Sequence, residues 1–271
     1  MPGCESPATW RHPWNSRRAM PVTFTGLHGI GEIGAGADLA PMIWKAAAAV
    51  RELRDADVVV IAQKIVSKAE DRWVDLKSVS PSPRALSLAV ETGKDPRLVE
   101  VILRESQEVL RAKPGVIVVV HRQGYVMAHA GVDQSNVGRT PDADCALLLP
   151  EHCDTSAERI RRQLAALSGK SVAVVISDSF GRAWRNGTVN IALGVAGLPA
   201  LVDRRGEHDR DGRILRATEI GFADAIAAGA GLAMGEADEG TPVVLVGGLT
   251  WNAPPSTGKA LLRAKTEDMF R

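Results

Sequence analysis

The chain has 271 residues, of which 45% are hydrophobic and 24% are charged. This length and composition predict a globular protein with a large core, in a single domain or two closely packed subdomains. Lys and Arg number 33 against 32 Asp and Glu, so a formal charge of +1 gives no overall field that favours nucleic acid or an anionic membrane. Any site for a polyanion is therefore expected to be local.

The cysteines and the amino-terminal segment indicate the cellular compartment of the protein. Cys4, Cys145 and Cys153 are an odd number without C-x-x-C spacing, which favours a reducing compartment over a disulfide framework or a zinc site. Residues 1–20 hold no apolar run of signal-peptide length, and no later stretch reaches about 18 consecutive apolar residues. We expect a flexible tail at 1–20, a single domain at 21–271 that could comprise two closely packed subdomains, and a cytoplasmic location.

Apolar runs rich in β-branched residues predict strands, and apolar residues three to four apart predict helices. The predicted strands, in chain order, are residues 22–25, 58–63, 115–121, 125–128, 146–149, 172–177 and 242–247. The predicted helices are residues 39–53, 84–92, 96–112, 156–167, 218–232 and 256–270. Asp154-Thr155-Ser156 is expected to cap the fourth of these helices. The pattern predicts a mixed α/β (α+β) fold, with a mixed sheet and flanking helices.

Two glycine-containing patterns resemble nucleotide-binding motifs only in part. Residues 29–34 satisfy G-x-G-x-x-G, but the next predicted strand ends in Gln63-Lys64, where a dinucleotide fold needs an acidic residue. We expect turn glycines or a loop that touches a ligand. Gly169-Lys170-Ser171 has Leu164 where a P-loop needs its first glycine. A Rossmann or P-loop site is therefore not predicted.

A third pattern mimics a calcium-binding loop. Glu207, Asp209, Asp211 and Gly212 follow the start of an EF-hand, but the acid that should close the loop comes one residue late, at Glu219. That shift takes the carboxylate out of the coordination sphere. We predict a solvated, charged turn.

Two segments place polar residues just after predicted strands. Residues 63–70 present lysines and a serine where a strand end could offer them to a phosphate, although a solvated loop is the favoured interpretation when the segment is taken alone. In residues 130–138, Asp133 offers a hard oxygen to a cation, and Asn136 can orient a base or a phosphate. An Asx turn is the structural alternative there.

Two further segments carry acids and arginines. Asp178 and Ser179 follow a buried strand and form a natural pair for a divalent metal, while Arg182 and Arg185 have the planar forks that match phosphate or carboxylate. Residues 234–241 end a predicted helix with a glycine-flanked acidic loop. This loop could add a metal ligand, or it could simply stop the helix.

Together these segments resemble the coenzyme F420-0:L-glutamate ligase family. The matching residues run in order from about Thr25 to Leu249, which covers most of the chain. They are Gly26-Leu27, Ile65-Val66-Ser67-Lys68-Ala69-Glu70, Ala130-Gly131-Val132-Asp133, Ser135-Asn136-Val137, Asp178-Ser179, Gly181-Arg182 and Gly235-Glu236. This ordered series is much more specific than any one of the motifs.

The resemblance implies a nucleotide- and metal-dependent acid–amino-acid ligase with a fold of its own type. Such an enzyme uses GTP to join L-glutamate to the lactyl carboxylate of a lactyl-phospho-deazaflavin, coenzyme F420-0, through an acyl phosphate. The resemblance also implies Mg²⁺ or Mn²⁺ at two sites, a monovalent cation such as K⁺, and a homodimer. Its partners are then small-molecule substrates, with no nucleic acid and no membrane.

The resemblance also assigns roles to individual residues. Asp133 and Asp178 match acids that hold one divalent ion, and Ser179 and Glu236 match ligands of the second. The residues that match the guanine-nucleotide site are Leu27, His28, Gly29, Ile30, Gln63, Lys68, Asn136, Met234, Gly235, Glu236, Ala237, Asp238, Glu239, Gly240 and Thr241. Lys68, Arg182 and Arg185 are the candidates for stabilising the phosphoryl group as it moves.

Two departures from the family pattern keep other functions open. Asp211 stands where an aromatic residue is common, and Ala225 replaces an acid. A ligase for another acidic acceptor is one alternative. A metal-dependent nucleotide phosphohydrolase and a catalytically silent nucleotide-binding protein are two more.

Overall fold

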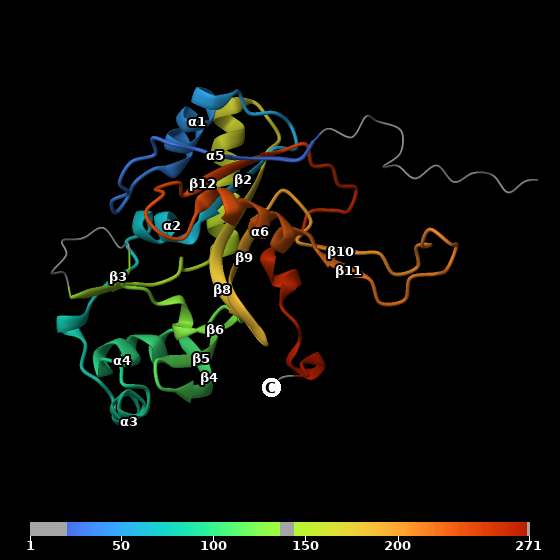
Figure 1. The fold of residues 1–271 in the computed structure, drawn as a ribbon. Helices are drawn as coiled ribbons and strands as arrows, with labels where there is room; N and C mark the ends of the chain where they lie inside the picture. Colours follow the sequence, from blue (N-terminus) through green and yellow to red (C-terminus); the bar gives the residue numbers. More distant parts are fainter. Residues whose placement is uncertain (1–20, 136–143, 270–271) are drawn as a thin grey trace, which may run out of the picture.

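The computed structural model describes residues 21–135 and 144–269, and its largest sheet has five strands (Figure 1). In spatial order these are β1 (Thr23–Gly26), β12 (Val243–Gly247), β2 (Val58–Ala62), β8 (Ala173–Arg182) and β9 (Arg185–Ala196). β2 and β8 are parallel, and the other neighbouring pairs are antiparallel. The predicted mixed sheet is thus confirmed, and the arrangement is not of the Rossmann type.

The central strand β2 is buried on both faces. Val58, Val59, Val60 and Ile61 are all 0% exposed, as expected for a continuous apolar run with helices on either side. Because successive side chains of a strand point to opposite faces, Val59 and Ile61 enter one core, and Val58 and Val60 enter another.

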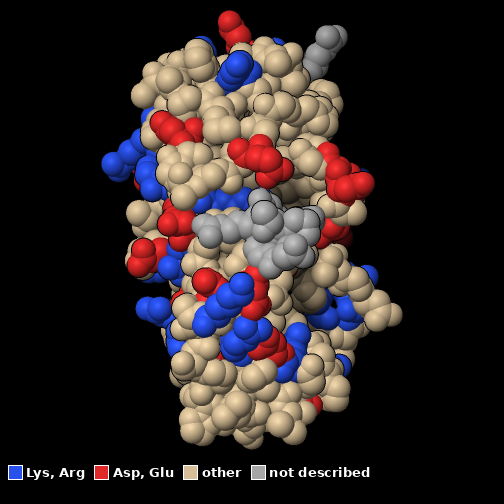
Figure 2. Space-filling view, turned by 90° about the vertical axis from the view of Figure 1, so that its left-hand side faces the viewer, with Lys and Arg blue, Asp and Glu red and all other residues tan. Residues whose placement is uncertain are grey.

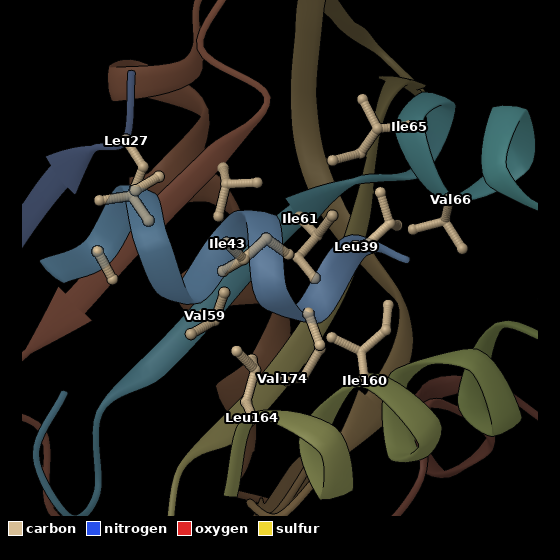
Figure 3. Packing of buried hydrophobic residues seen from close by; sticks show 14 of the residues in the cluster. Leu27, Leu39, Ile43, Val59, Ile61, Ile65, Val66, Ile160, Leu164 and Val174 are labelled. Atoms are coloured by element: carbon tan, nitrogen blue, oxygen red, sulfur yellow. The ribbon is translucent and has the colours of Figure 1, made fainter. Parts of the chain in front are cut away.

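Helices fill these two cores. On the side of Val59 and Ile61, α1 (Leu39–Val50) and α5 (Cys153–Ser168) pack together against the sheet, as Figure 3 shows. On the side of Val58 and Val60 lies α6 (Phe222–Met234). The helices on the two faces of the sheet hold β2 and β8 in place, and with them the residues that follow β2.

A further core lies below the central sheet in Figure 1, between two helices and a three-stranded sheet. Its elements are α3 (Pro83–Thr92), α4 (Pro96–Arg104), β4 (Ser106–Lys113), β5 (Val116–His121) and β6 (Val126–Ala128). The remaining elements are α2 (Gln63–Ala69), β3 (Trp73–Asp75), η2 (Leu76–Ser78), η3 (His129–Gly131), β7 (Cys145–Leu147), β10 (Leu201–Asp203), β11 (Glu219–Gly221), η4 (Gly258–Leu261) and η5 (Lys265–Glu267). β3 pairs with β7, and β10 pairs with β11.

The predicted helix at residues 96–112 is wrong in its second half. α4 ends at Arg104, and residues 106–113 instead form β4, which pairs with β5 along its length. The polar residues of β4 have ordinary helix propensity, but pairing with the apolar strand β5 outweighs it.

The carboxy-terminal helix predicted at residues 256–270 is also wrong, because only the short turns η4 and η5 form there. Gly258 lies against the backbone of Leu193, and its amide donates to Asp154 Oδ1 at 2.7 Å. The same oxygen accepts from the amide of Val195 at 2.9 Å. Asp154 therefore joins three segments instead of capping α5, which begins at Cys153.

The partial motifs behave as turns. Gly29 and Gly31 have φ of 78° and 75°, and β1 is an antiparallel edge strand, so no dinucleotide-binding βαβ unit is formed. The calcium-like segment lies in the loop between β10 and β11, which extends away from the central sheet (Figure 1). Asp209 Oδ1 accepts there from the amides of Asp211 and Arg213 at 2.9 and 2.8 Å, which confirms the predicted charged turn. Within the described ranges, no helix has the length and apolar character needed to cross a membrane.

Candidate active site

A pocket of about 700 Å³ opens at the edge of the central sheet where β2 ends and its parallel pairing with β8 stops. Neighbouring parallel strands deliver the residues that follow them to the same edge, which is where α/β sheets bind ligands. Of the predicted site residues, the pocket lining includes Gln63, Lys68, Asp178, Ser179, Met234, Gly235, Glu236, Ala237, Asp238, Glu239, Gly240 and Thr241. Three segments that are distant in the sequence, residues 63–68, 178–179 and 234–241, thus meet there.

Asp178 is the acid at the end of the buried part of β8. Burial, together with the negative charges of Asp133 and Glu236, raises the pKa of Asp178 to about 7 against the opposing effects of the Ser179 amide and Lys64. A cation bound at Asp178 would offset this unfavourable environment for the carboxylate.

Asp133, from the loop after η3, is held by both of its carboxylate oxygens. Oδ1 accepts from the amide and the hydroxyl of Ser135 at 2.7 and 2.9 Å, and Oδ2 lies 2.7 Å from Lys64 Nζ. Burial acts to raise the pKa of Asp133, but the hydrogen bonds from Lys64 and Ser135 outweigh it and the pKa is lowered. Asp133 is thus held as a carboxylate beside the pocket.

The helix α2 begins directly after β2 and supplies two predicted ligand-binding residues. Gln63 is 3% exposed, and its Oε1 accepts from Ser67 Oγ at 2.9 Å. Lys68 is 7% exposed, and its Nζ lies 3.8 Å from Glu32, whose side chain is 89% exposed. Such a distant and solvated partner contributes little, so the ammonium of Lys68 is available to an anion in the pocket.

The loop of residues 234–241 forms another wall. Met234 is buried, and its sulfur lies 3.6 Å from Asn190 Nδ2 on β9. Gly235 has a φ of 74°, and a side chain there would collide with the carboxylate of Glu239, whose Oε2 accepts from the amide of Ala237 at 2.8 Å. Glycine is therefore required at this close approach.

Other predicted residues lie outside the pocket lining. Leu27 and Ile30 are buried in the core, while His28 and Gly29 are exposed after β1, with His28 Nδ1 3.4 Å from Thr241 Oγ1. Asn136 lies outside the described residues.

Arg182 and Arg185 do not converge with Lys68. They are exposed and pair with each other at the end of the β8–β9 hairpin, where Arg182 Nη2 donates to the carbonyl of Asn186 at 3.2 Å. Arg182 follows Asp178 by four positions of the strand, roughly 13 Å at the usual rise per residue. The hairpin therefore carries both guanidinium groups away from the acids.

Four polar residues that line the pocket were not predicted as site residues: Glu32, Lys64, Ser177 and Asn190. Lys64 stands in the segment 63–70, whose polar residues at a strand end were the available signal. Asn190 lies on β9, for which the sequence predicts no strand. Figure 2 shows basic and acidic side chains interspersed on one face of the molecule, as expected for a chain with a formal charge of +1.

The donor groups around the pocket fit a hard divalent cation in their chemistry. Asp133, Asp178, Ser179 and Glu236 supply carboxylate and hydroxyl oxygens, which Mg²⁺ and Mn²⁺ prefer. The described parts of the chain do not bring three His, Cys, Asp or Glu side chains into one ligating group. Asp178, Ser179 and Glu236 line the pocket, whereas Asp133 lies outside its lining and is joined to it through the ion pair with Lys64.

The fold and the pocket define an α/β protein with a pocket of acidic and basic side chains at an edge of its central sheet. A sequence model of the F420-0:Gamma-glutamyl ligase family matches residues 29–248. The chain is also 46% identical over 255 residues to the coenzyme F420:L-glutamate ligase of Methanothermobacter thermautotrophicus, which covers 93% of this chain and all of the relative. The chain belongs to this family of ligases.

Two more relatives have the same name. The coenzyme F420:L-glutamate ligase of Methanocaldococcus jannaschii is 45% identical over 221 residues, covering 81% of this chain and 86% of the relative. That of Halorubrum lacusprofundi is 44% identical over 224 residues, covering 80% and 84%.

Proposed function

We propose that this protein uses GTP and a divalent cation to join L-glutamate to the lactyl carboxylate of coenzyme F420-0. The names of its relatives support the two substrates. One structural observation carries the proposal: Asp178, Glu236 and the buried ammonium of Lys68 line one pocket together with the glycine-flanked loop 234–241. A polyphosphate with bound metal needs such a combination of acids, an ammonium and close backbone amides.

The reaction divides the formation of the amide into two steps. An oxygen of the acceptor carboxylate first attacks the γ-phosphorus of GTP, so that an O–P bond forms, the bond to the β-phosphate breaks and GDP leaves. The amine of glutamate then attacks the acyl phosphate, a C–N bond forms, and inorganic phosphate leaves as the amine loses a proton. No protein side chain needs to act as the nucleophile.

The residues of the pocket have distinct parts in this scheme. Lys68 binds and stabilises the phosphoryl charge, and residues 234–241 hold the nucleotide. Asp133 and Asp178 would hold one divalent ion, and Ser179 with Glu236 the second. When bound, such ions screen the charges that keep the nucleotide and the acceptor carboxylate apart.

The arginines of the hairpin have a different place in the scheme. Because Arg182 and Arg185 lie beyond the pocket lining, they are better placed to grip the phosphodiester of an extended acceptor than the phosphoryl group in transfer. The K⁺ requirement and the homodimer are proposed on the family resemblance alone.

The test supplies purified protein with GTP, Mn²⁺, L-glutamate and the deazaflavin acceptor, and follows the product by mass spectrometry. We expect the mass of one glutamyl residue to be added to the acceptor, and GDP release to depend on the acceptor. Rapid GTP cleavage without acceptor or glutamate would indicate a phosphohydrolase, and binding without turnover would indicate a silent protein. Turnover with another acid would indicate a ligase of different specificity.

A further inference from the structure

Lys64 directs its ammonium group at the loop that carries Asp133. Lys64 Nζ lies 2.7 Å from Asp133 Oδ2 and 3.3 Å from both the carbonyl oxygen and the hydroxyl of Ser135. An ammonium has three protons, so these contacts account for its donors. The pair is only partly exposed, with 27% of the Lys64 side chain and 32% of the Asp133 side chain accessible.

Asp133 has its two oxygens engaged by these neighbours. Oδ1 accepts two hydrogen bonds from Ser135, and Oδ2 faces Lys64. The ammonium of Lys64 therefore occupies the position beside Oδ2 that a divalent cation from the pocket would take. A carboxylate oxygen has a second lone pair, but two positive groups on one oxygen repel each other strongly at such distances.

Lys64 also lies near the second acid, because the pocket lining includes both Lys64 and Asp178. Since Lys64 lines the pocket itself, its ammonium supplies one positive charge in the region where a divalent cation would supply two.

We propose that Lys64 is a positioning residue that stands in for the divalent cation in the metal-free protein and is displaced when the cation binds. The ammonium holds the carboxylate of Asp133 in place until the metal arrives, and because it occupies Oδ2 it weakens metal binding. Lys64 and Lys68 are four residues apart on α2, so their side chains lie on the same face of the helix. The displaced ammonium then remains at the pocket beside Lys68. The proposal rests on the proposed function only in treating Asp133 and Asp178 as metal ligands.

The test measures the affinity of the nucleotide-free protein for Mn²⁺ alone, by titration with detection of free Mn²⁺ by electron paramagnetic resonance. Lys64→Met keeps an unbranched stem and removes the charge, and it should bind Mn²⁺ at least about tenfold more tightly than the wild type, equivalent to about 1.4 kcal/mol. Lys64→Arg retains the charge and should show no such gain.

Lys68→Met is the matched control. It removes the same charge from the same face of α2 but not from the ion pair with Asp133, so its gain in affinity should be much smaller. A gain as large as that of Lys64→Met would overturn the proposal, because the net charge of the pocket would then explain both results.

A second measurement follows the ion pair without metal. In the presence of a chelator, Lys64→Met should lower the melting temperature in the wild-type background and have almost no further effect in the Asp133→Asn background. Equal effects in both backgrounds would contradict the stand-in role.

The outcomes separate this proposal from the proposed function. If the wild type binds Mn²⁺ and Lys64→Met binds it equally or more weakly, the role of Lys64 is refuted and the metal site stands. If neither protein binds Mn²⁺, the proposal is refuted together with the assignment of the metal ligands.

Discussion

Replacing Asp178 with asparagine should change how the stability of the metal-free protein depends on pH. Burial, with the nearby charges of Asp133 and Glu236, raises the pKa of Asp178 from the ordinary 3.8 to about 7. The native protein then keeps this proton up to about pH 7, whereas the unfolded chain releases it near pH 4. The native state therefore loses stability as the pH rises between these values, and Asp178→Asn removes that loss.

The size of the effect follows from the two pKa values. Each pH unit between them costs the wild type about 1.4 kcal/mol, which gives about 4 kcal/mol over the whole interval. About 2–3 kcal/mol of this falls between pH 5 and pH 8, where acid denaturation interferes less. The stability advantage of Asp178→Asn over the wild type should grow by that amount across this range.

The assay is urea unfolding in the presence of a chelator at a series of pH values. Glu91→Gln is a suitable control, because it removes a carboxylate that is exposed on α3. Its unfolding free energy should run parallel to that of the wild type. If the unfolding free energy of Asp178→Asn also runs parallel to that of the wild type, the raised pKa of Asp178 is refuted. Added Mn²⁺ at pH 8 should stabilise the wild type more than Asp178→Asn.

Three other substitutions test single features. Lys68→Ala should raise the GTP concentration needed for half-maximal rate, and unchanged GTP kinetics would remove Lys68 from the phosphate site. Arg182→Lys should reduce amide formation at least about tenfold, roughly 1.4 kcal/mol, with GTP binding changed much less, and an unaltered rate would show that the guanidinium fork is not used. Asp154→Ala should lower the unfolding free energy by about 2–3 kcal/mol in urea, because the amides of Val195 and Gly258 lose their acceptor, and a change below about 0.5 kcal/mol would contradict that role.

The parts of the fold that the sequence predicts well are those whose burial is uniform. β2 is recognisable because all of its first four residues are buried and β-branched. β9 is not recognisable, because its first half, from Arg185, is polar and exposed while its second half is buried. The register of β9 is set by its pairing with β8 in a long hairpin. The local residue preferences of β9 do not specify it. The same dependence on a partner strand explains the error at residues 106–113.

The sequence predicts which segments form the site, but it does not predict how their side chains contact one another. Polar residues after the buried strands β2 and β8 indicate one edge of a sheet, and the structure places Gln63, Lys68 and Asp178 there. The ion pair of Lys64 with Asp133 joins residues far apart in the sequence, and no local pattern reports it. The position of Arg182 was missed for a related reason: continuation of β8 as a strand replaces the expected turn and extends the chain away from the acids.

The predicted site residues differ in how much they destabilise the ligand-free fold. A residue that destabilises the fold is stronger evidence for a functional role than one that does not. Because the pKa of Asp178 is raised to about 7, its ionised form is expected to weaken the metal-free fold at neutral pH by roughly a few kcal/mol, which an uncharged amide would not do. Lys68 is buried with a distant and solvated partner, which also costs free energy. Arg182 and Arg185 are exposed and cost the fold almost nothing. Residues that destabilise a fold are often retained because they are needed for function. Asp178 and Lys68 therefore support the ligase proposal more strongly than Arg182 and Arg185 do.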